Sequence, residues 1–331
     1  NMKKVLSYTL VSTFILASCS GGGGGGSTSN NAPETPIQNP YNLTCSSYQS
    51  NTQKCSFTHN NIIREYYIYI PSSYTPSSNA PLMFVLHGYG SSATEIMFYS
   101  SFQNLAEEDS YIIVYPQGSL LNGVAHWNVG GLTIGPTPIS ALRNSFKYFF
   151  FPANDVDFIE TIIEFVDNEY FINNERIYST GMSNGGYMSY KLACDLSSKI
   201  AAIVSVTGSM TPETLDGCSP THATSIAQIH GLQDSVVNYY GSLWSEPIEE
   251  VIDYWSNFNN CNETPETIEI TGSNGGGIHD IYSNCDNQTN VELFLMTNMG
   301  HDWPNFDNHD LQASTTVWDF LSKYDINGLI D

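Results

Sequence analysis

Short apolar runs rich in β-branched and aromatic residues alternate along this chain with segments of helical periodicity. Because this alternation is typical of strands joined by crossover helices, it predicts an α/β domain with a mostly parallel central sheet and helices on both faces. The predicted strands are 62–70, 82–86, 111–115, 176–180, 201–206, 225–229 and 291–296. The predicted helices are 92–108, 155–170, 185–196, 248–258 and 314–324, the second capped by Asn154 or Asp155. In such sheets functional sites form at the carboxyl ends of the strands.

The first 18 residues have the pattern of an export signal. An apolar stretch at residues 5–16 follows two lysines and is too short to span a bilayer stably. The run Leu16-Ala17-Ser18-Cys19 resembles the bacterial lipobox, in which the cysteine is acylated and becomes the mature N-terminus. Residues 19–44, with Cys19 lipidated, then form a Gly/Ser/Pro-rich tether, and residues 45–331 form a single folded domain. The alternative is a plain signal peptide that contains a cysteine.

This pattern predicts an exported protein. By resemblance to bacterial lipoproteins, Ser20 after the cysteine favours the outer membrane or the cell surface, and the protein could also be released extracellularly. The N-terminal lipid is the membrane contact that we expect. The chain carries 33 acidic and 10 basic residues, a formal net charge of −23 at pH 7. A surface so negative repels phosphate backbones, so a nucleic-acid partner is not expected. The oligomeric state is not indicated.

If Cys19 carries lipid, the six remaining cysteines form an even set, which in an exported chain indicates disulfides. Six cysteines allow about 15 pairings, so the pattern alone does not fix the connectivity. Proximity in the sequence favours Cys45–Cys55, Cys194–Cys218 and Cys261–Cys285. The alternative is that one pair stays reduced and packs as small hydrophobic residues.

The run Gly181-Met182-Ser183-Asn184-Gly185 fits the pattern G-x-S-x-G. It follows a predicted strand and opens a predicted helix, which is the context of a nucleophile elbow in α/β-hydrolases. The tight turn needs small flanking residues and exposes the hydroxyl at the start of the helix. We therefore predict that Ser183 is a nucleophile. The alternative is a structural turn.

A serine hydroxyl needs a base to take its proton, and the base needs an acid to orient it. In α/β-hydrolases the order along the chain is Ser, acid, His. His301 follows the last predicted strand and Asp234 follows the strand that ends near residue 229, so both lie at strand ends in the right order. We predict His301 as base and Asp234 as acid. His309 and His279 lack this context, and Asp302 is badly placed to reach the far nitrogen of the neighbouring histidine.

Acyl transfer also needs donors for the developing oxyanion. The N–H of Asn184, directly after the nucleophile, is one candidate. The N–H of Tyr89 in the run Leu86-His87-Gly88-Tyr89-Gly90 is the second, and His87 is expected to shape this loop. Trp127 and Trp303 could form an aromatic wall for substrate, with packing as the alternative for each. Residues 130–153 form a long irregular segment that could be a substrate-binding flap, a lid or a surface excursion.

The ordered motifs resemble a known family. From about residue 60 to 325 the chain is similar to bacterial polyhydroxybutyrate depolymerases and related feruloyl esterases of the α/β-hydrolase fold. The matching runs are LHGYG at 86–90, YPQG at 115–118, WNVGG at 127–131, NDVDFI at 154–159, RIYSTGMSNGG at 176–186, LAC at 192–194, HGLQD at 230–234 and GHDWP at 300–304. The resemblance implies a triad on the same three residues and no metal or organic cofactor. It also supports the pairings Cys194–Cys218 and Cys261–Cys285.

The chain departs from the pattern of this family in two respects. The 130–153 segment is longer than the usual spacing between the WN and NDV motifs, which affects the expected substrate pocket. No further module for gripping solid polymer follows residue 331, which favours soluble oligomers or small esters. The leading hypothesis is a secreted serine esterase that works through an acyl-enzyme on hydroxyalkanoate oligomers or another polyester. The alternative is a feruloyl esterase acting on plant polysaccharide esters. A remote alternative is a surface lipoprotein that binds without catalysis.

Overall fold

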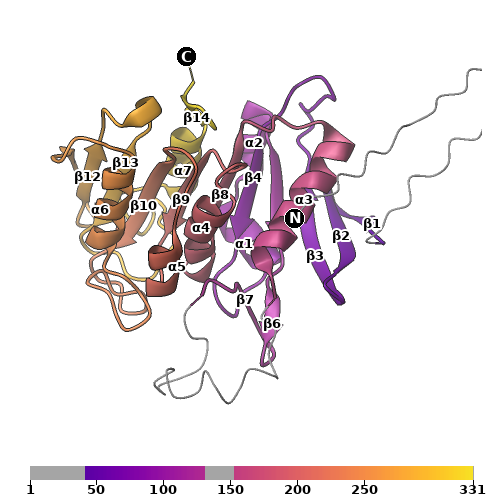
Figure 1. Ribbon diagram of the computed structural model, residues 1–331, viewed down its shortest axis with the longest axis horizontal. Helices are drawn as coiled ribbons and strands as arrows, with labels where there is room; N and C mark the ends of the chain where they lie inside the picture. Colours follow the sequence, from indigo (N-terminus) through magenta and orange to yellow (C-terminus); the bar gives the residue numbers. More distant parts are fainter. Residues whose placement is uncertain (1–41, 131–152, 331) are drawn as a thin grey trace, which may run out of the picture. The chain divides into compact units, whose positions relative to one another are not determined.

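An eleven-stranded sheet runs through the part of the protein that the computed structural model describes, residues 42–130 and 153–330 (Figure 1). The predicted export signal, Cys19, most of the tether and most of the 130–153 segment lie outside the described residues. The strand order is β1-β2-β3-β5-β4-β8-β9-β10-β13-β12-β11. The bounds are β1 Thr44–Gln49, β2 Thr52–His59, β3 Ile62–Tyr69, β4 Leu82–Leu86, β5 Ile112–Pro116, β8 Ile177–Met182, β9 Ala202–Val206, β10 Ser225–Gly231, β11 Glu266–Ile270, β12 Gly277–Tyr282 and β13 Val291–Met296.

The middle of the sheet is parallel and its two edges are antiparallel. Strands β5, β4, β8, β9, β10 and β13 pair in parallel. On one side β3, β2 and β1 continue the sheet in antiparallel pairing, and on the other side β12 and β11 do the same. The parallel centre confirms the predicted fold class. The carboxyl ends of its strands therefore share one edge of the sheet.

Helices cover both faces of the sheet, as predicted (Figure 1). On one face α3 Asp155–Tyr170, α4 Asn184–Asp195 and α6 Ile248–Phe258 bury apolar side chains in one cluster, to which β4 contributes Leu82, Phe84 and Leu86. On the other face α1 Ala93–Ser100, α2 Gln103–Asp109 and α7 Ala313–Leu321 bury apolar side chains in a second cluster, to which β4 contributes Met83 and Val85. Strands buried on both faces read as continuous apolar runs, which is why the sequence indicates them clearly.

The structure differs from the predicted elements at several points. The single helix expected at 92–108 is two helices, because Ser101 adopts a left-handed conformation (φ 52°) that ends α1. Strands β1, β2, β11 and β12 and the short hairpin of β6 Ser119–Leu121 and β7 Val124–His126 are additional, as are α5 Pro212–Gly217 and the C-terminal hairpin of β14 Tyr324–Asp325 and β15 Gly328–Leu329. Asn154 is the N-cap of α3, since its side chain accepts from the N–H of Asp157, and Asp155 is the first helical residue.

The described domain contains three disulfides, and they join the pairs that sequence proximity favours. Cys45–Cys55 links directly paired residues of β1 and β2. Cys194–Cys218 ties the end of α4 to the residue after α5, and Cys261–Cys285 joins the segments after α6 and after β12. Within the described ranges, no helix combines the length and the apolar character that crossing a bilayer requires.

Candidate active site

Ser183 occupies a strained turn between β8 and α4. Its backbone has φ 55° and ψ −121°, a conformation that costs a residue with a side chain about 1–3 kcal/mol. Its N–H donates to the carbonyl of Val206 at the end of β9, which fixes the turn against the sheet (2.8 Å). A Cβ on Gly181 would lie 2.6 Å from the carbonyl oxygen of Leu86, and one on Gly185 would collide with the same oxygen. The two glycines of the motif are therefore needed for the close packing of this turn against β4.

His301 and Asp234 form a hydrogen-bonded pair. The Nδ1 atom of His301 lies 2.8 Å from Oδ2 of Asp234. Since an ionised carboxylate can only accept, Nδ1 carries the proton and the neutral imidazole keeps Nε2 free to accept another. The Asp234 side chain has no exposed surface, whereas that of His301 is 20% exposed. This is the arrangement in which an aspartate orients a histidine as a base.

The environment of Asp234 keeps it ionised. Burial acts to raise the pKa of this carboxyl, but the hydrogen bond and charge of His301 and two backbone N–H groups outweigh it, so the pKa is lowered. The N–H groups of Val236 and Val237 donate to Oδ1, both at 2.9 Å. Each carboxylate oxygen thus has its own donors, and the orientation toward the imidazole is fixed.

The loops that carry the three residues meet at the carboxyl edge of the sheet. The N–H of Gln233 donates to the carbonyl of Met299, which joins the acid loop to the base loop (3.0 Å). The Tyr99 hydroxyl reaches the sulfur of Met182, directly before Ser183, and its ring lies 6.0 Å from that of Trp303, two residues past His301. The structure therefore brings Ser183, Asp234 and His301 to one region.

The glycine-rich loop after β4 lies against the nucleophile. A Cβ on Gly88 would lie 3.5 Å from the Cβ of Ser183, so the chain preceding Tyr89 passes directly beside the serine. Gly90 has φ 75°, a conformation suited to glycine, and its N–H donates to the carbonyl of Ala125. The N–H of Asn184 stands at the first position of α4, where the helix supplies no acceptor. The loop that carries Tyr89 and the N–H of Asn184 thus both adjoin Ser183, and their role as oxyanion donors stays a prediction.

His87 shapes this loop, in line with the expectation. It is fully buried, and its Nε2 accepts from the N–H of Gly118 (2.9 Å), so that nitrogen is unprotonated. Nδ1 then carries the hydrogen and donates to the carbonyl of Gly88 (2.7 Å). Burial lowers the pKa of His87 even though the Gly88 carbonyl opposes this, and the ring is therefore neutral.

Trp127 has a different position from the one expected of a substrate contact. Its side chain is fully buried, and its indole N–H donates to the carbonyl of His87 (2.9 Å). Its backbone is held by the amide of Asn184, which accepts from the Trp127 N–H (2.7 Å) and donates to the Trp127 carbonyl (3.1 Å). With no exposed surface, the ring does not support an aromatic wall for substrate. It supports the loop that carries Tyr89.

Trp303 is also a packing residue. It is 8% exposed, its indole N–H donates to the hydroxyl of Ser314 (3.1 Å), and its ring packs edge-on to Phe102. The alternative of packing, which the sequence left open for both tryptophans, is the one that fits their burial. Phe98 and Tyr99, which the sequence did not single out, are exposed aromatic side chains of this region.

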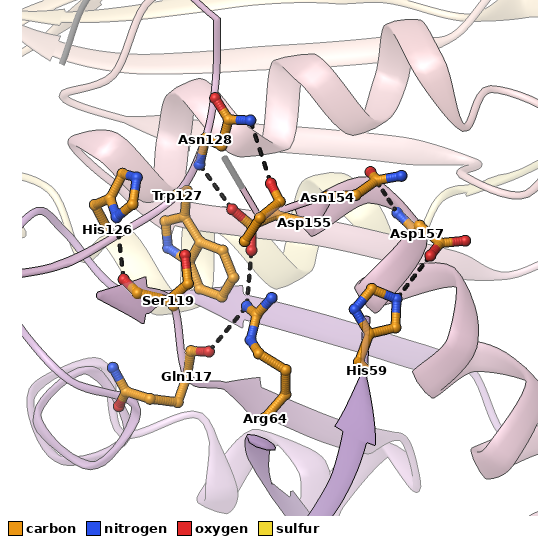
Figure 2. Close-up of polar contacts among 12 residues, drawn as sticks. His59, Arg64, Gln117, Ser119, His126, Trp127, Asn128, Asn154, Asp155 and Asp157 are labelled. Atoms are coloured by element: carbon orange, nitrogen blue, oxygen red, sulfur yellow. Dashed lines mark hydrogen bonds and ion pairs between the residues drawn. The ribbon is translucent and has the colours of Figure 1, made fainter. Parts of the chain in front are cut away.

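A buried ion pair holds the segment that carries Trp127 and Asn128 (Figure 2). Asp155 accepts from the guanidinium of Arg64 (2.7 Å) through one oxygen and from the N–H of Asn128 (2.7 Å) through the other. The Asn128 side chain donates to the carbonyl of Ala153 (3.2 Å), and Arg64 also donates to the carbonyl of Gln117 (3.2 Å). The WN and NDV motifs of the sequence thus bind each other and fix the chain on both sides of residues 131–152.

Arg64 and Asp155 were missed as supporting residues, although two signals were present. Arg64 is one of very few arginines in the chain, and it stands within a strand that is mostly apolar and aromatic. Asp155 opens a helix within a motif of the resemblance. The two histidines that the sequence offered as alternatives to His301 pair elsewhere: His309 lies 3.2 Å from Asp302, and His279 lies 2.7 Å from Glu292.

Comparisons with known proteins show the family. Residues 74–257, more than half of the chain, match the profile of the family described as Phospholipase/Carboxylesterase. The chain is 23% identical to the bifunctional acetylxylan esterase/xylanase XynS20E of Neocallimastix patriciarum over 80% of its length, and 27% identical to feruloyl esterase B of Piromyces equi over 72%. These alignments cover only 34% and 42% of the two relatives.

A solved structure gives the fold. The acetyl xylan esterase from Aspergillus awamori superimposes with a TM-score of 0.56 at 16% sequence identity, covering 81% of this chain and 98% of that one. Identity at this level supports the shared fold alone. The sheet and helices described above are those of an α/β-hydrolase.

Proposed function

Because the chain belongs to the phospholipase/carboxylesterase family, we propose that it is a serine carboxylesterase that removes acyl groups from plant polysaccharides. The observation that carries this proposal is the hydrogen bond between His301 and the buried Asp234, at the same edge of the sheet as the strained Ser183. A strained, partly exposed serine at the same sheet edge as an oriented imidazole fits the constellation of acyl transfer.

In the proposed mechanism the Ser183 hydroxyl attacks the ester carbonyl while Nε2 of His301 takes its proton. Asp234 stabilises the imidazolium that forms. The oxyanion accepts hydrogen bonds from the N–H groups of Tyr89 and Asn184, each worth about 3–4 kcal/mol of transition-state stabilisation. The intermediate collapses, His301 returns the proton to the leaving alcohol, and an acyl-serine remains. Water then attacks the acyl-serine while His301 takes its proton, the bond between the acyl group and Oγ breaks, and the carboxylic acid leaves as His301 returns the proton to Ser183.

Two kinds of relative support the polysaccharide ester over the hydroxyalkanoate oligomer. The matched relatives are described as acetylxylan and feruloyl esterases. The formal charge of −23 disfavours an acidic polymer as substrate, whereas a neutral xylan-type chain is not repelled. Hydroxyalkanoate oligomers, which carry no side-chain charge, remain the competing substrate class.

We also infer that the protein is exported and lipid-anchored through Cys19. Three disulfides fit an oxidising compartment. Expression of the full chain in a Gram-negative bacterium with labelled palmitate tests the anchor. We expect label in the membrane fraction and none after Cys19→Ala. Equal labelling of both proteins would contradict the assignment.

Covalent labelling tests the nucleophile. A fluorophosphonate probe reacts only with an activated serine, so we expect one labelled site and no label in Ser183→Ala. Ser110 is the matched control, because it is also half-exposed with a positive φ (58°) but follows α2, away from the His–Asp pair. Ser110→Ala should label like the wild type. Labelling that survives in Ser183→Ala would overturn the assignment.

Hydrolysis of a small panel tests the substrate class. The panel contains 4-nitrophenyl acetate, methyl ferulate, acetylated and feruloylated xylo-oligosaccharides, and 3-hydroxybutyrate oligomers. We expect the highest kcat/KM on the polysaccharide esters and a loss of at least about 10³-fold in Ser183→Ala. Preference for 3-hydroxybutyrate oligomers would replace the polysaccharide with a polyester. Binding of oligosaccharide with no hydrolysis of any ester would favour a non-catalytic binding protein.

A further inference from the structure

A groove crosses α1 beside the candidate active site. It consists of two adjoining hollows of about 440 and 530 Å³ that share Thr94, Phe98 and Tyr99 as lining residues. The first hollow is completed by Ser91 and Glu95, and the second extends to Tyr48 and Gln49 of β1. We call the two hollows together the α1 groove.

One end of the α1 groove lies at the candidate catalytic centre. Ser91 follows Gly90 of the proposed oxyanion loop directly, and its N–H donates to the carbonyl of Gly88 (3.2 Å). Tyr99 reaches Met182, the residue before Ser183, through its hydroxyl. A chain that leaves the scissile ester at Ser183 in this direction therefore enters the groove.

The far end lies on β1, at the edge of the sheet. There Tyr48 is 47% exposed and packs edge-on to Tyr67 with ring centroids 4.7 Å apart, which holds its ring in place. Between the two ends Phe98 is 86% exposed, an unusual degree for a large apolar side chain on a helix. Contiguous exposed rings of this kind mark binding surfaces in soluble proteins.

Hydrogen-bonding side chains accompany the rings. Gln49, Gln103, Thr94 and Ser101 contribute amide and hydroxyl groups to the second hollow. The face of a pyranose presents C–H groups that pack on an aromatic ring, while its hydroxyls at the rim need donors and acceptors. Rings with neutral polar side chains around them match both needs.

The charge of the groove selects among polymers. The described residues that line it include Glu95 and no lysine or arginine, and the whole chain carries −23. A uronate-rich chain would be repelled here, and a neutral chain would not. We propose that the α1 groove binds the neutral oligosaccharide chain of the ester substrate, the part that leaves as the alcohol. This inference rests on the proposed function for the place of the scissile bond.

Binding can be measured without turnover. Calorimetry with the full chain carrying Ser183→Ala uses xylohexaose, oligogalacturonate and 3-hydroxybutyrate oligomers as probes. We expect xylohexaose to bind, and its Kd to rise about tenfold when Tyr48→Ala or Phe98→Ala is added. Ile268→Ala is the matched control, since this residue is 46% exposed on β11 at the opposite edge of the sheet. It should leave the Kd as it was.

Three results would overturn the groove proposal. The first is that xylohexaose does not bind, and the second is that oligogalacturonate binds as tightly as xylohexaose. The third is that Tyr48→Ala and Phe98→Ala weaken the binding of hydroxybutyrate oligomers but not that of xylohexaose. Kinetics separates this failure from that of the enzyme. In active protein we expect Tyr48→Ala to lower kcat/KM for a feruloylated xylo-oligosaccharide relative to methyl ferulate by about tenfold. An unchanged ratio in an active enzyme refutes the groove alone, whereas an inactive wild type refutes the proposed function.

Discussion

The side-chain amide of Asn184 binds both backbone groups of Trp127, accepting from its N–H at 2.7 Å and donating to its carbonyl at 3.1 Å. Asn184 follows the proposed nucleophile and offers one proposed oxyanion donor, while Trp127 holds the loop of the other through the carbonyl of His87. The two halves of the proposed oxyanion hole are thus joined through two side chains, those of Asn184 and Trp127.

Asn184→Ala tests this connection. The variant keeps its backbone N–H but loses two hydrogen bonds, each worth about 1 kcal/mol, so the two donors lose their fixed separation. We expect kcat on 4-nitrophenyl acetate to fall at least about tenfold, with a decrease in Tm. Asn168→Ala is the control, because that amide only donates to a carbonyl of its own helix. An unchanged kcat in Asn184→Ala would show that the oxyanion donors do not depend on the connection.

Asp234→Asn tests the acid. The amide lacks the charge that stabilises the imidazolium and can favour the wrong histidine tautomer, so kcat should fall by about 10³–10⁴-fold. Asp302→Asn is a stringent control, because Asp302 is adjacent to the base in sequence but pairs with His309 and is exposed. We expect it to change kcat by less than about threefold. Similar losses in both variants would mean that Asp234 has no special role.

The sequence predicts those parts of the fold in which burial imposes a pattern. Strands β4, β5, β8, β9, β10 and β13 are buried on both faces and appear as apolar runs, and the proposed triad residues follow three of them. Strand β1 is exposed at all positions, so hydrophobicity gives no signal there. Its place depends on pairing with β2 and on the Cys45–Cys55 disulfide.

Roles that depend on tertiary contacts were harder to predict. A tryptophan near a glycine-rich loop can face substrate or core, and only the fold shows that Trp127 is fully buried. The break at Ser101 is similar, since a serine carries little preference for the left-handed region. The α1 groove joins a helix to a strand more than 40 residues earlier, and sequence periodicity contains no information on that contact.

Asp155→Asn tests the ion pair behind the active-site loop. The change leaves the guanidinium of Arg64 charged and buried over the ring of Phe158, with no compensating carboxylate. We expect the free energy of unfolding to decrease by about 3–5 kcal/mol. Adding Arg64→Met removes the stranded charge, so the double variant should be more stable than Asp155→Asn alone. Urea unfolding measures both, and a double variant that is less stable than the single one would contradict this account.

His230 is buried beneath the loop that carries Asp234, and it should make the stability depend on pH. Its Nε2 donates to the carbonyl of Val237, and its Nδ1 accepts from the side chain of Gln228, both at 2.9 Å, so the ring is neutral. Burial lowers its pKa to about 4, although the Val237 carbonyl and Asp234 favour the charged form. In the unfolded chain the pKa is about 6.5.

Between about pH 6.5 and 4 the unfolded chain therefore binds more protons at this position than the native protein does. The free energy of unfolding must fall as the pH decreases through this window, by up to about 1.4 kcal/mol per pH unit for one group. Asp234, whose pKa is lowered in the native protein, adds slope only toward the acid end of this window, where the unfolded carboxyl begins to bind a proton, and this contribution is the same with and without His230. His230→Gln keeps a donor and an acceptor but does not titrate. Urea unfolding at pH 4.5, 5.5 and 6.5 should give a shallower slope for His230→Gln, and an identical slope would refute the neutral, buried state of His230.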